Sequence, residues 1–447
     1  MKKERRVPLA CLWWMNPLNL FLATVIPLSL FALLIPDENY VLYWRTGKHF
    51  NPIDLALMGL IALTFVLGAV VANVTNKLPR TPVANSAEEF PWLLVFRLFQ
   101  AGFVMTTAGY LIWLAICIGK GVSLELLLSV LKGEEGSIYI TRDLGGEALL
   151  PGVTTCTQFG MATGVLGVLI GWRFGWKKTG WHLSILATMA LVRALFFSER
   201  LAFIEVSLPP AILLLRLKLG QQITTRARKI LSLLPIASVA AIFILFTTTE
   251  YFRSWVNFYA AQGESIFWHS LMRLLGYYVT ALNNGALYFK TIGVLDLPFY
   301  TVQWFWKFPL MPLFSKNIDS YMHMLNDQFE LILTQDANLE FNNPSGTFIT
   351  FSDFGLIGAS VLWFSAGWIG MMLYRAFQRG TAAGLLLYPF YFIGLTEVCR
   401  IFYWGETRAF PTWLYLLATL LLVRLSPKRA LSPIMARAAV PPPVATS

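Results

Sequence analysis

Apolar runs long enough, or nearly long enough, to cross a bilayer recur along the whole chain, and this pattern constrains the fold more than any motif. A transmembrane helix needs about 20 mainly apolar residues. The composition agrees, because 56% of the 447 residues are hydrophobic and only 13% are charged, which is about half the charged share of a soluble domain. We therefore expect an all-α, polytopic membrane protein in which residues 1–447 form one integral membrane domain with no soluble catalytic module attached.

The apolar runs predict about ten transmembrane helices. They are expected near Leu18 to Pro36, Ile53 to Asn73, Pro91 to Ile118, Pro151 to Trp172, Trp181 to Phe197, Leu201 to Leu215, Ile230 to Thr249, Phe354 to Tyr374, Ala382 to Val398 and Phe410 to Val423. Leu274 to Leu295 could be an eleventh span, but Asn283, Asn284 and Lys290 argue against it. An even number of spans places both termini on one side of the membrane.

The distribution of Lys and Arg gives these spans an orientation. Basic residues are dense in both tails and in the segments 173–178, 216–229 and 375–379, which all fall on one side. Cytoplasmic segments carry an excess of Lys and Arg, so this face and both termini are predicted to be cytoplasmic. The net charge of +11 is then a consequence of topology, and no nucleic-acid partner is expected. Residues 432–447 are predicted to be a disordered tail.

The opposite, non-cytoplasmic face carries a very long segment. Residues 250–353 form a loop of roughly 100 residues, far beyond the usual connection length. Aromatic and aliphatic residues run through this loop, so its composition is not that of a disordered segment. We expect one or two helices in or on the membrane interface there, with Trp304, Phe305 and Trp306 as an aromatic anchor.

The most informative polar residues lie in the apolar segment 189–215, which contains Arg193, Glu199, Arg200 and Glu205. A charge at the bilayer centre costs about 2.5 to 3.5 kcal/mol, so a cluster held there predicts a functional site. Arg193 and Arg200 are seven residues apart and share a helical face. Guanidinium groups suit a pyrophosphate, because they give permanent, bidentate contacts. The alternative is a set of internal ion pairs, Arg193 with Glu199 or Arg200 with Glu205, that only neutralise buried charge.

Other polar candidates lie in this non-cytoplasmic loop. Glu250 and Arg253 have the spacing of a surface salt bridge at the mouth of a helix. His323 and Asp327 could form an acid–base pair, or could lie on a solvated helix face. Further residues have types and spacing found both in sugar contacts and in interfacial helices: Arg273, Tyr277, Tyr278, Asn283 and Asn284.

The segment 341–360 contains a turn followed by the start of a predicted helix. Asn343 belongs to the turn Asn-Asn-Pro-Ser-Gly, whose residue types favour tight turns. Asp353 could cap exposed amides at the start of the helix or act in catalysis. The glycines at 355, 358, 367 and 370 are expected to serve helix packing.

No metal or other cofactor is expected. The chain has no HExxH, P-loop or GxGxxG context, and its four histidines are too scattered for a metal cluster. The four cysteines show no CxxC spacing and lie in or beside apolar runs, which indicates packing residues. Cys117 and Cys156 both lie towards the non-cytoplasmic side and could in principle form a disulfide.

Taken in order, these motifs resemble the Wzy-type polymerases of O-antigen and exopolysaccharide repeat units. The resemblance rests on ALFFSER at 194–200, on EYFRSW and YYVTALNN in the long loop, and on N-x-P-S-G-T followed by SDFG-x-x-G. It spans Arg193 to Tyr374, and its weight comes from the order and sidedness of the motifs. It implies a GT-C-like membrane enzyme in the bacterial inner membrane.

The resemblance also implies an activity. The enzyme would join repeat units carried on undecaprenyl pyrophosphate at the periplasmic face, by inverting, metal-independent glycosyl transfer. Its partners would be this lipid-linked oligosaccharide and the bilayer, with a chain-length regulator and a flippase as candidate protein partners. Arginines would stabilise the leaving pyrophosphate, and a base would activate the acceptor hydroxyl, with Glu199, Glu250, His323 and Asp353 all open as that base.

We accordingly expect two groups of site residues. The catalytic candidates are Arg193, Glu199, Arg200 and Asp353, and the substrate-binding candidates are Arg253, Arg273, Tyr277, Tyr278, Asn283, Asn284, His323 and Asn343. Two alternatives stay open. A ligase that transfers finished glycan would need a loop histidine, for which His269 or His323 could serve. A lipid-linked oligosaccharide flippase would normally show internal repeats and charges on several helices.

Overall fold

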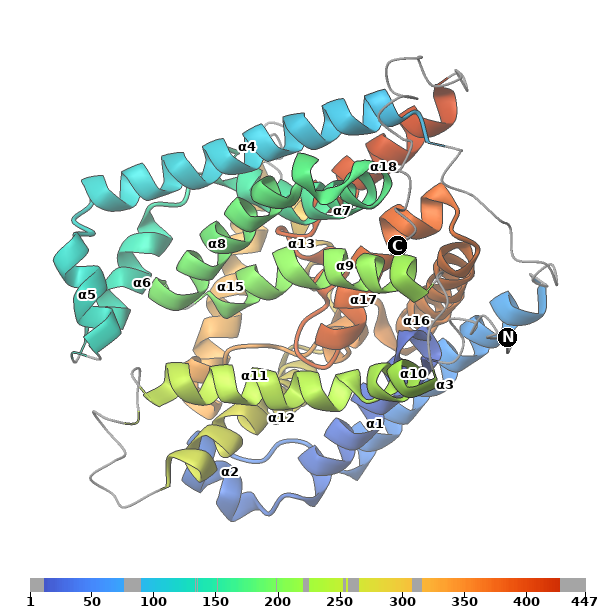
Figure 1. The fold of residues 1–447 in the computed structure, drawn as a ribbon. Helices are drawn as coiled ribbons and strands as arrows, with labels where there is room; N and C mark the ends of the chain where they lie inside the picture. Colours follow the sequence, from blue (N-terminus) through green and yellow to red (C-terminus); the bar gives the residue numbers. More distant parts are fainter. Residues whose placement is uncertain are drawn as a thin grey trace.

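The chain folds into a bundle of helices (Figure 1). The computed structural model describes residues 12–75, 90–132, 134, 136–150, 152–197, 199–219, 225–251, 255, 265–307 and 316–426. Within these ranges every regular element is a helix, so the predicted all-α class is confirmed. The predicted tail at 432–447 and Arg253 lie outside the described residues.

Five of the described helices are long and apolar enough to cross a membrane: α1 (Pro17–Leu34), α3 (Pro52–Thr75), α4 (Trp92–Gly119), the pair of η4 (Thr154–Phe159) and α7 (Gly160–Phe174), and α16 (Phe348–Arg379). A sixth arises if α10 (Thr225–Ser232) and α11 (Leu234–Glu250), which meet at 51°, are taken as one bent span. The protein is therefore a helical protein with several membrane-capable helices.

Four further helices fall where spans are predicted. Three are apolar but shorter: α8 (Gly180–Phe196), α17 (Ala382–Glu397) and α18 (Phe410–Leu425). The fourth is α9 (Arg200–Leu219), which packs against α7, α8 and α17. Each of the ten segments predicted to cross the membrane is thus helical in the structure.

Helix α9 is not broken at its two prolines. The pair Pro209–Pro210 predicts a short, broken segment, yet the helix runs without interruption through both prolines. The packing of α9 against α7 explains why α9 is unbroken. A Cβ atom at Gly164 would lie 2.6 Å from Cγ of Pro210, so the glycine leaves the space that the proline ring fills. Packing against the neighbouring helix here overrides the local helix-breaking tendency of proline.

Helices α3 and α16 cross in direct backbone contact. A Cβ atom at Gly68 would lie 1.9 Å from the carbonyl oxygen of Phe364, and one at Gly367 would lie 2.1 Å from that of Phe65. Gly370 makes similar room for the ring of Tyr391. The predicted packing role is therefore confirmed for Gly367 and Gly370. Gly355 differs, because with φ +63° and ψ −173° it forms a kink inside α16.

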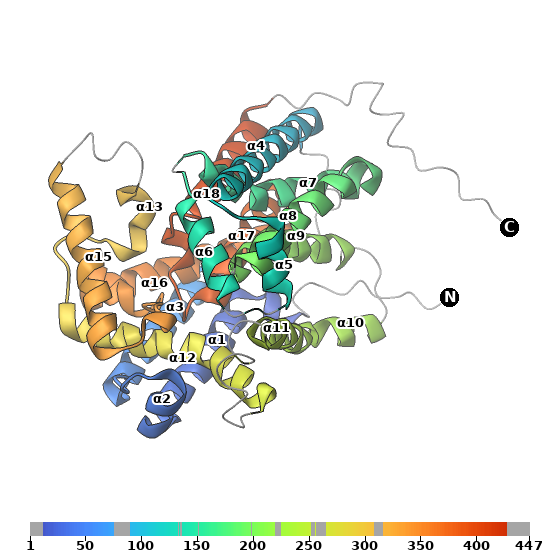
Figure 2. The same ribbon diagram turned by 90° about the vertical axis from the view of Figure 1, so that its left-hand side faces the viewer.

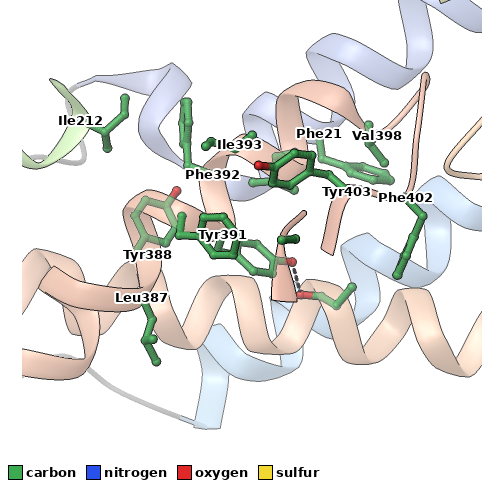
Figure 3. Close-up of a cluster of buried hydrophobic side chains, with 14 of the residues drawn as sticks. Phe21, Ile212, Leu387, Tyr388, Tyr391, Phe392, Ile393, Val398, Phe402 and Tyr403 are labelled. Carbon is green, nitrogen blue, oxygen red and sulfur yellow. Dashed lines mark hydrogen bonds between the residues drawn. The ribbon is translucent and has the colours of Figure 1, made fainter. Parts of the chain in front are cut away.

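The core between α1, α3, α16 and α17 is rich in aromatic rings (Figure 3). Phe21 stacks on Phe65 with ring centroids 3.9 Å apart. The hydroxyl of Tyr391 donates a 2.7 Å hydrogen bond to the carbonyl of Ala366, and Tyr388 donates to Met15. The buried hydroxyls of Tyr388 and Tyr391 thus each have an acceptor, as burial requires.

The two ends of the bundle differ. One end, which we call the loop-rich end, is formed by α2 (Asp37–Trp44), α5 (Leu124–Lys132), α6 (Ser137–Glu147), α12 (Ile266–Ile292) and α15 (Lys316–Asp336). It lies on the left in Figure 1 and faces the viewer in Figure 2. The other end carries α10 and the end of α18. Short turns complete the described elements: η2 (Trp13–Met15), η5 (Trp176–Lys178), η8 (Tyr300–Val302), α13 (Gln303–Trp306), η9 (Leu339–Phe341) and η10 (Tyr403–Gly405).

Helix α12 covers most of the proposed eleventh span but lies among the elements of the loop-rich end. Its residues contact the segment 44–54: Trp44 donates to the carbonyl of Met272 at 2.9 Å, and Lys290 reaches Asp54 at 2.6 Å. It is not among the described helices that are long and apolar enough to cross a membrane. The polar residues that argue against an eleventh span are the ones that hold α12 in this place.

Candidate functional site

Arg193 lies in the last turn of α8 and is only 5% exposed. Its Nη2 lies 2.8 Å from Oε2 of Glu199, and its Nη1 donates a long, 3.4 Å hydrogen bond to the hydroxyl of Thr157. The guanidinium sits 5.1 Å from the ring centroid of Trp113, where a cation is attracted by the ring face. Arg193 and Glu199 therefore form the internal ion pair considered as the alternative. The structure describes the backbone of Arg200, at the start of α9, but not its side chain.

Glu205, one turn into α9, is the single carboxylate of this helix and is 2% exposed. It accepts a 2.9 Å hydrogen bond from the hydroxyl of Tyr403, and Nη1 of Arg408 lies 3.5 Å away. Both partners come from the segment 398–409 that connects α17 to α18. Because the side chain of Arg408 keeps 38% of its surface exposed, this cation is accessible as well as anchored.

The same connecting segment carries more charge. Nε of Arg400 lies 3.0 Å from Oε2 of Glu397, at the end of α17. Glu406 is partly buried, and the positive charges of Arg408, Lys307 and Arg400 all act on it. Burial raises the pKa of Glu406, and the three cations oppose that rise. Glu406 therefore lies in a segment that carries positive charge on both sides of it in the sequence.

Arg273 forms a second centre on α12. It makes a bidentate ion pair with Glu340 and lies 3.6 Å from Glu250, and its guanidinium sits 5.0 Å from the ring centroid of Phe341. Arg273 thus holds two acids, one from the end of α11 and one from η9, on the surface of α12.

We call these charged groups together the charged belt. Its cations are Arg193, Arg273, Arg400 and Arg408 with the nearby Lys307, and its acids are Glu199, Glu205, Glu250, Glu340, Glu397 and Glu406. Its members include residues of the α8–α9 junction, the end of α17 and α12. Each of these charges has a neighbour of opposite sign. Such pairing offsets the free-energy cost of holding many charges in an otherwise apolar bundle.

Asp353 lies outside the belt and caps a neighbouring element. Its carboxylate accepts hydrogen bonds from the amides of Phe299, Tyr300 and Thr301 at 2.9, 3.1 and 2.6 Å and from the Thr301 hydroxyl at 2.6 Å. The expected capping role is thus exercised on the turn at 299–301, not on the start of its own helix. Four donors occupy the carboxylate, so we assign it a structural role.

The two asparagines of α12 also act on backbone. Asn283 accepts from the amides of His49 and Phe50 at 2.6 and 3.0 Å and donates to Gly47 at 2.8 Å, which fixes the loop before α3. Asn284 donates to the carbonyl of Phe341. These bonds give both side chains a role in holding the backbone of neighbouring segments.

The remaining predicted residues fall in three places. Tyr277 packs against Phe246 and Phe341, whereas Tyr278 faces Glu397 and Arg400 of the belt. His323 is exposed on α15 and lines a shallow groove of about 570 Å³ with Asp327.

Asn343 is partly buried in the turn before α16. That turn packs closely on the α17–α18 connection, because a Cβ atom at Gly346 would lie 2.3 Å from the carbonyl oxygen of Ile401. Cys117 and Cys156, considered above as a disulfide, are both free.

The sequence reasoning missed the α17–α18 connection. Within EVCRIFYWGETR at 397–408, four charges stand between two apolar helices. This is the same signal, charge inside apolar sequence, that singles out the segment 189–215. None of these four charges is among the site residues proposed from the sequence.

Comparisons with protein-family models, with curated proteins and with solved structures find no match to this chain. Among the described residues, no group of three or more His, Cys, Asp or Glu side chains is placed to hold a metal ion.

Proposed function

We propose that this protein polymerises oligosaccharide repeat units carried on undecaprenyl pyrophosphate, at the periplasmic face of the bacterial inner membrane. The observation that supports the proposal is the presence of Arg400 and Arg408, paired with Glu397 and Glu205, in the short segment that joins the apolar helices α17 and α18. Glycosyl transfer from a lipid pyrophosphate needs cations for the leaving group and a base for the acceptor, both at the membrane surface.

The proposed orientation follows from the two ends of the bundle. We propose that the ten predicted segments all span the membrane, with the loop-rich end in the periplasm and α10 in the cytoplasm. The basic segments 173–178, 216–229 and 375–379 support this orientation by the positive-inside rule. In this arrangement both termini are cytoplasmic, and α12 and α15 belong to the large periplasmic loop at 250–353.

Within this proposal, the cations divide into two kinds. Arg408 and Arg400 keep 38% and 20% of their side chains exposed, so they, with the exposed Lys307, are proposed to bind the donor pyrophosphate. Arg193 is buried and paired with Glu199, and we propose that it positions the start of α9, where Arg200 begins the helix. Removing one such electrostatic contact to a transition state typically costs about 10²- to 10³-fold in rate.

A reconstitution experiment tests the proposal. Purified protein in lipid vesicles would receive single repeat units on undecaprenyl pyrophosphate, isolated from cells that lack the protein. The proposal predicts lipid-linked chains of two or more repeats, with release of undecaprenyl pyrophosphate. Chains formed only after another acceptor is added would identify a ligase. Movement of unaltered repeats across the vesicle membrane would identify a transporter.

A further inference from the structure

The carboxylates of the charged belt differ in whether they already have a partner. Five of them are bound to a cation or a hydroxyl: Glu199 to Arg193, Glu205 to Tyr403 and Arg408, Glu397 to Arg400, and both Glu250 and Glu340 to Arg273. The side chain of Glu406 forms no hydrogen bond or ion pair with any residue that the structure describes. Its carboxylate is therefore available to a ligand.

The surroundings of Glu406 suit a group that takes up a proton. Arg408, Lys307 and Arg400 place positive charge around it without closing an ion pair. Burial raises the pKa of this carboxyl above its ordinary value, which makes the carboxylate a stronger base than an exposed Glu. A base works best when its pKa lies closer to the operating pH.

The backbone holds Glu406 firmly. It follows η10 directly, and a Cβ atom at Gly405 would lie 1.8 Å from the carbonyl oxygen of Thr301. Thr301 is in turn held by Asp353. Next to this contact, Trp304 stacks on Phe410 with ring centroids 4.5 Å apart and planes at 1°. These contacts fix the backbone that carries the Glu406 carboxylate. A reacting group must be held in place in this way.

We propose that Glu406 is the catalytic base of the transfer reaction, receiving the proton of the acceptor sugar hydroxyl. The inference rests on the proposed function. As the proton moves to the carboxylate, the acceptor oxygen bonds to the anomeric carbon of the donor. The bond from that carbon to the pyrophosphate oxygen breaks, and its electron pair leaves with undecaprenyl pyrophosphate. The proton on Glu406 then passes to water, which restores the carboxylate.

The test compares Glu406→Gln, Glu406→Asp and the control Glu147→Gln in the vesicle assay. Glu147 lies at the end of α6, is exposed and pairs with Lys120. Glu406→Gln is expected to lower kcat about 10²- to 10⁴-fold, the usual contribution of a general base, with KM for the lipid-linked repeat little changed. Glu406→Asp should retain part of the activity, and Glu147→Gln all of it.

A pH profile separates a base from a residue that merely supports the fold. The wild-type kcat should fall as acid protonates Glu406, and that acid limb should be absent from the residual activity of Glu406→Gln. Wild-type kcat and an unchanged acid limb in Glu406→Gln would overturn the assignment while leaving the polymerase intact. Absence of chain growth by the wild-type protein would instead contradict the proposed function itself.

Discussion

At the scale of single residues, the protein keeps charge in apolar surroundings by pairing it. Arg193 has a carboxylate, a hydroxyl and an aromatic ring as neighbours, and Glu205 has a phenol and a guanidinium. Breaking one partner of a buried pair costs about 3–5 kcal/mol, because the other charge is left without compensation. These residues are therefore expected to serve both the fold and the site.

Arg193→Ala is expected to abolish chain growth while leaving the protein in the membrane. Loss of the guanidinium releases Glu199 and the start of α9. Arg193→Lys should restore part of the activity, because it keeps the charge but loses the forked contact. The measurement is polymer length on a gel, with membrane content followed by immunoblot. The control is Arg142→Ala on the exposed face of α6, and normal polymer in Arg193→Ala would remove this residue from the mechanism.

The raised pKa of Glu406 predicts a pH-dependent effect on stability. The folded state binds the proton more tightly than the unfolded state, so stability falls as pH rises from the ordinary glutamate pKa through the folded one. Glu406→Gln removes the titrating carboxyl and with it this loss of stability at higher pH. Its thermal unfolding midpoint should exceed that of the wild type at pH 7 and approach it at about pH 4, near the ordinary glutamate pKa. A lower midpoint for the variant at pH 7 would contradict the assignment of a raised pKa.

At the scale of elements, the site depends on contacts between turns. Asp353 caps the turn at 299–301, this turn contacts Gly405, and Gly405 precedes Glu406. The turn at Gly346 packs on the same connection from the α12 side. The resemblance motif ending in SDFG therefore lies close to the site without supplying its acid or base.

Asp353→Ala is expected to destabilise the protein by about 3 kcal/mol, because it leaves three buried amides and a hydroxyl without their acceptor. Asp353→Asn should cost less, since it keeps one oxygen acceptor. Thermal unfolding in detergent measures both effects, with Asp143→Ala on the exposed side of α6 as the control. If Asp353→Ala unfolds like the control but loses its activity, Asp353 has a chemical role that this geometry does not explain.

The sequence predicted the helices well and the site in part. Each of the ten apolar runs falls on a helix, and five of these helices, or six with the bent pair, are long and apolar enough to cross a membrane. The unbroken α9 could not be foreseen, since the space for its prolines comes from Gly164 on another helix. The pairing of Glu205 with Tyr403 and Arg408 joins residues about 200 positions apart, and one sequence gives no distance information of that kind. Arg193 and Glu199 were found because their signal is local.

At the scale of the whole molecule, the proposed polymerase activity requires that the charged belt face the periplasm. Helix α12, which carries Arg273 of the belt, belongs to the loop-rich end, and α10 lies at the opposite end (Figure 1). If the orientation were reversed, the belt would meet cytoplasmic rather than exported lipid-linked sugar. Topology is therefore a direct condition of the proposed activity.

Cysteine labelling tests this topology. In a background with the four native cysteines replaced, Asp143→Cys on α6 should react with a membrane-impermeant maleimide in intact spheroplasts. Lys177→Cys, in η5 at the opposite end, should react only after the membrane is permeabilised. The reversed pattern would place the belt in the cytoplasm and would rule out a periplasmic polymerase.

A mass-spectrometric inventory of lipid-linked glycans in cells that lack this protein tests the proposed polymerase activity most directly. Loss of a polymerase should cause single repeat units to accumulate on undecaprenyl pyrophosphate at the periplasmic face, and longer chains should return when the wild-type protein is restored. Full-length polymer retained on the lipid carrier, or single repeats trapped at the cytoplasmic face, would contradict it.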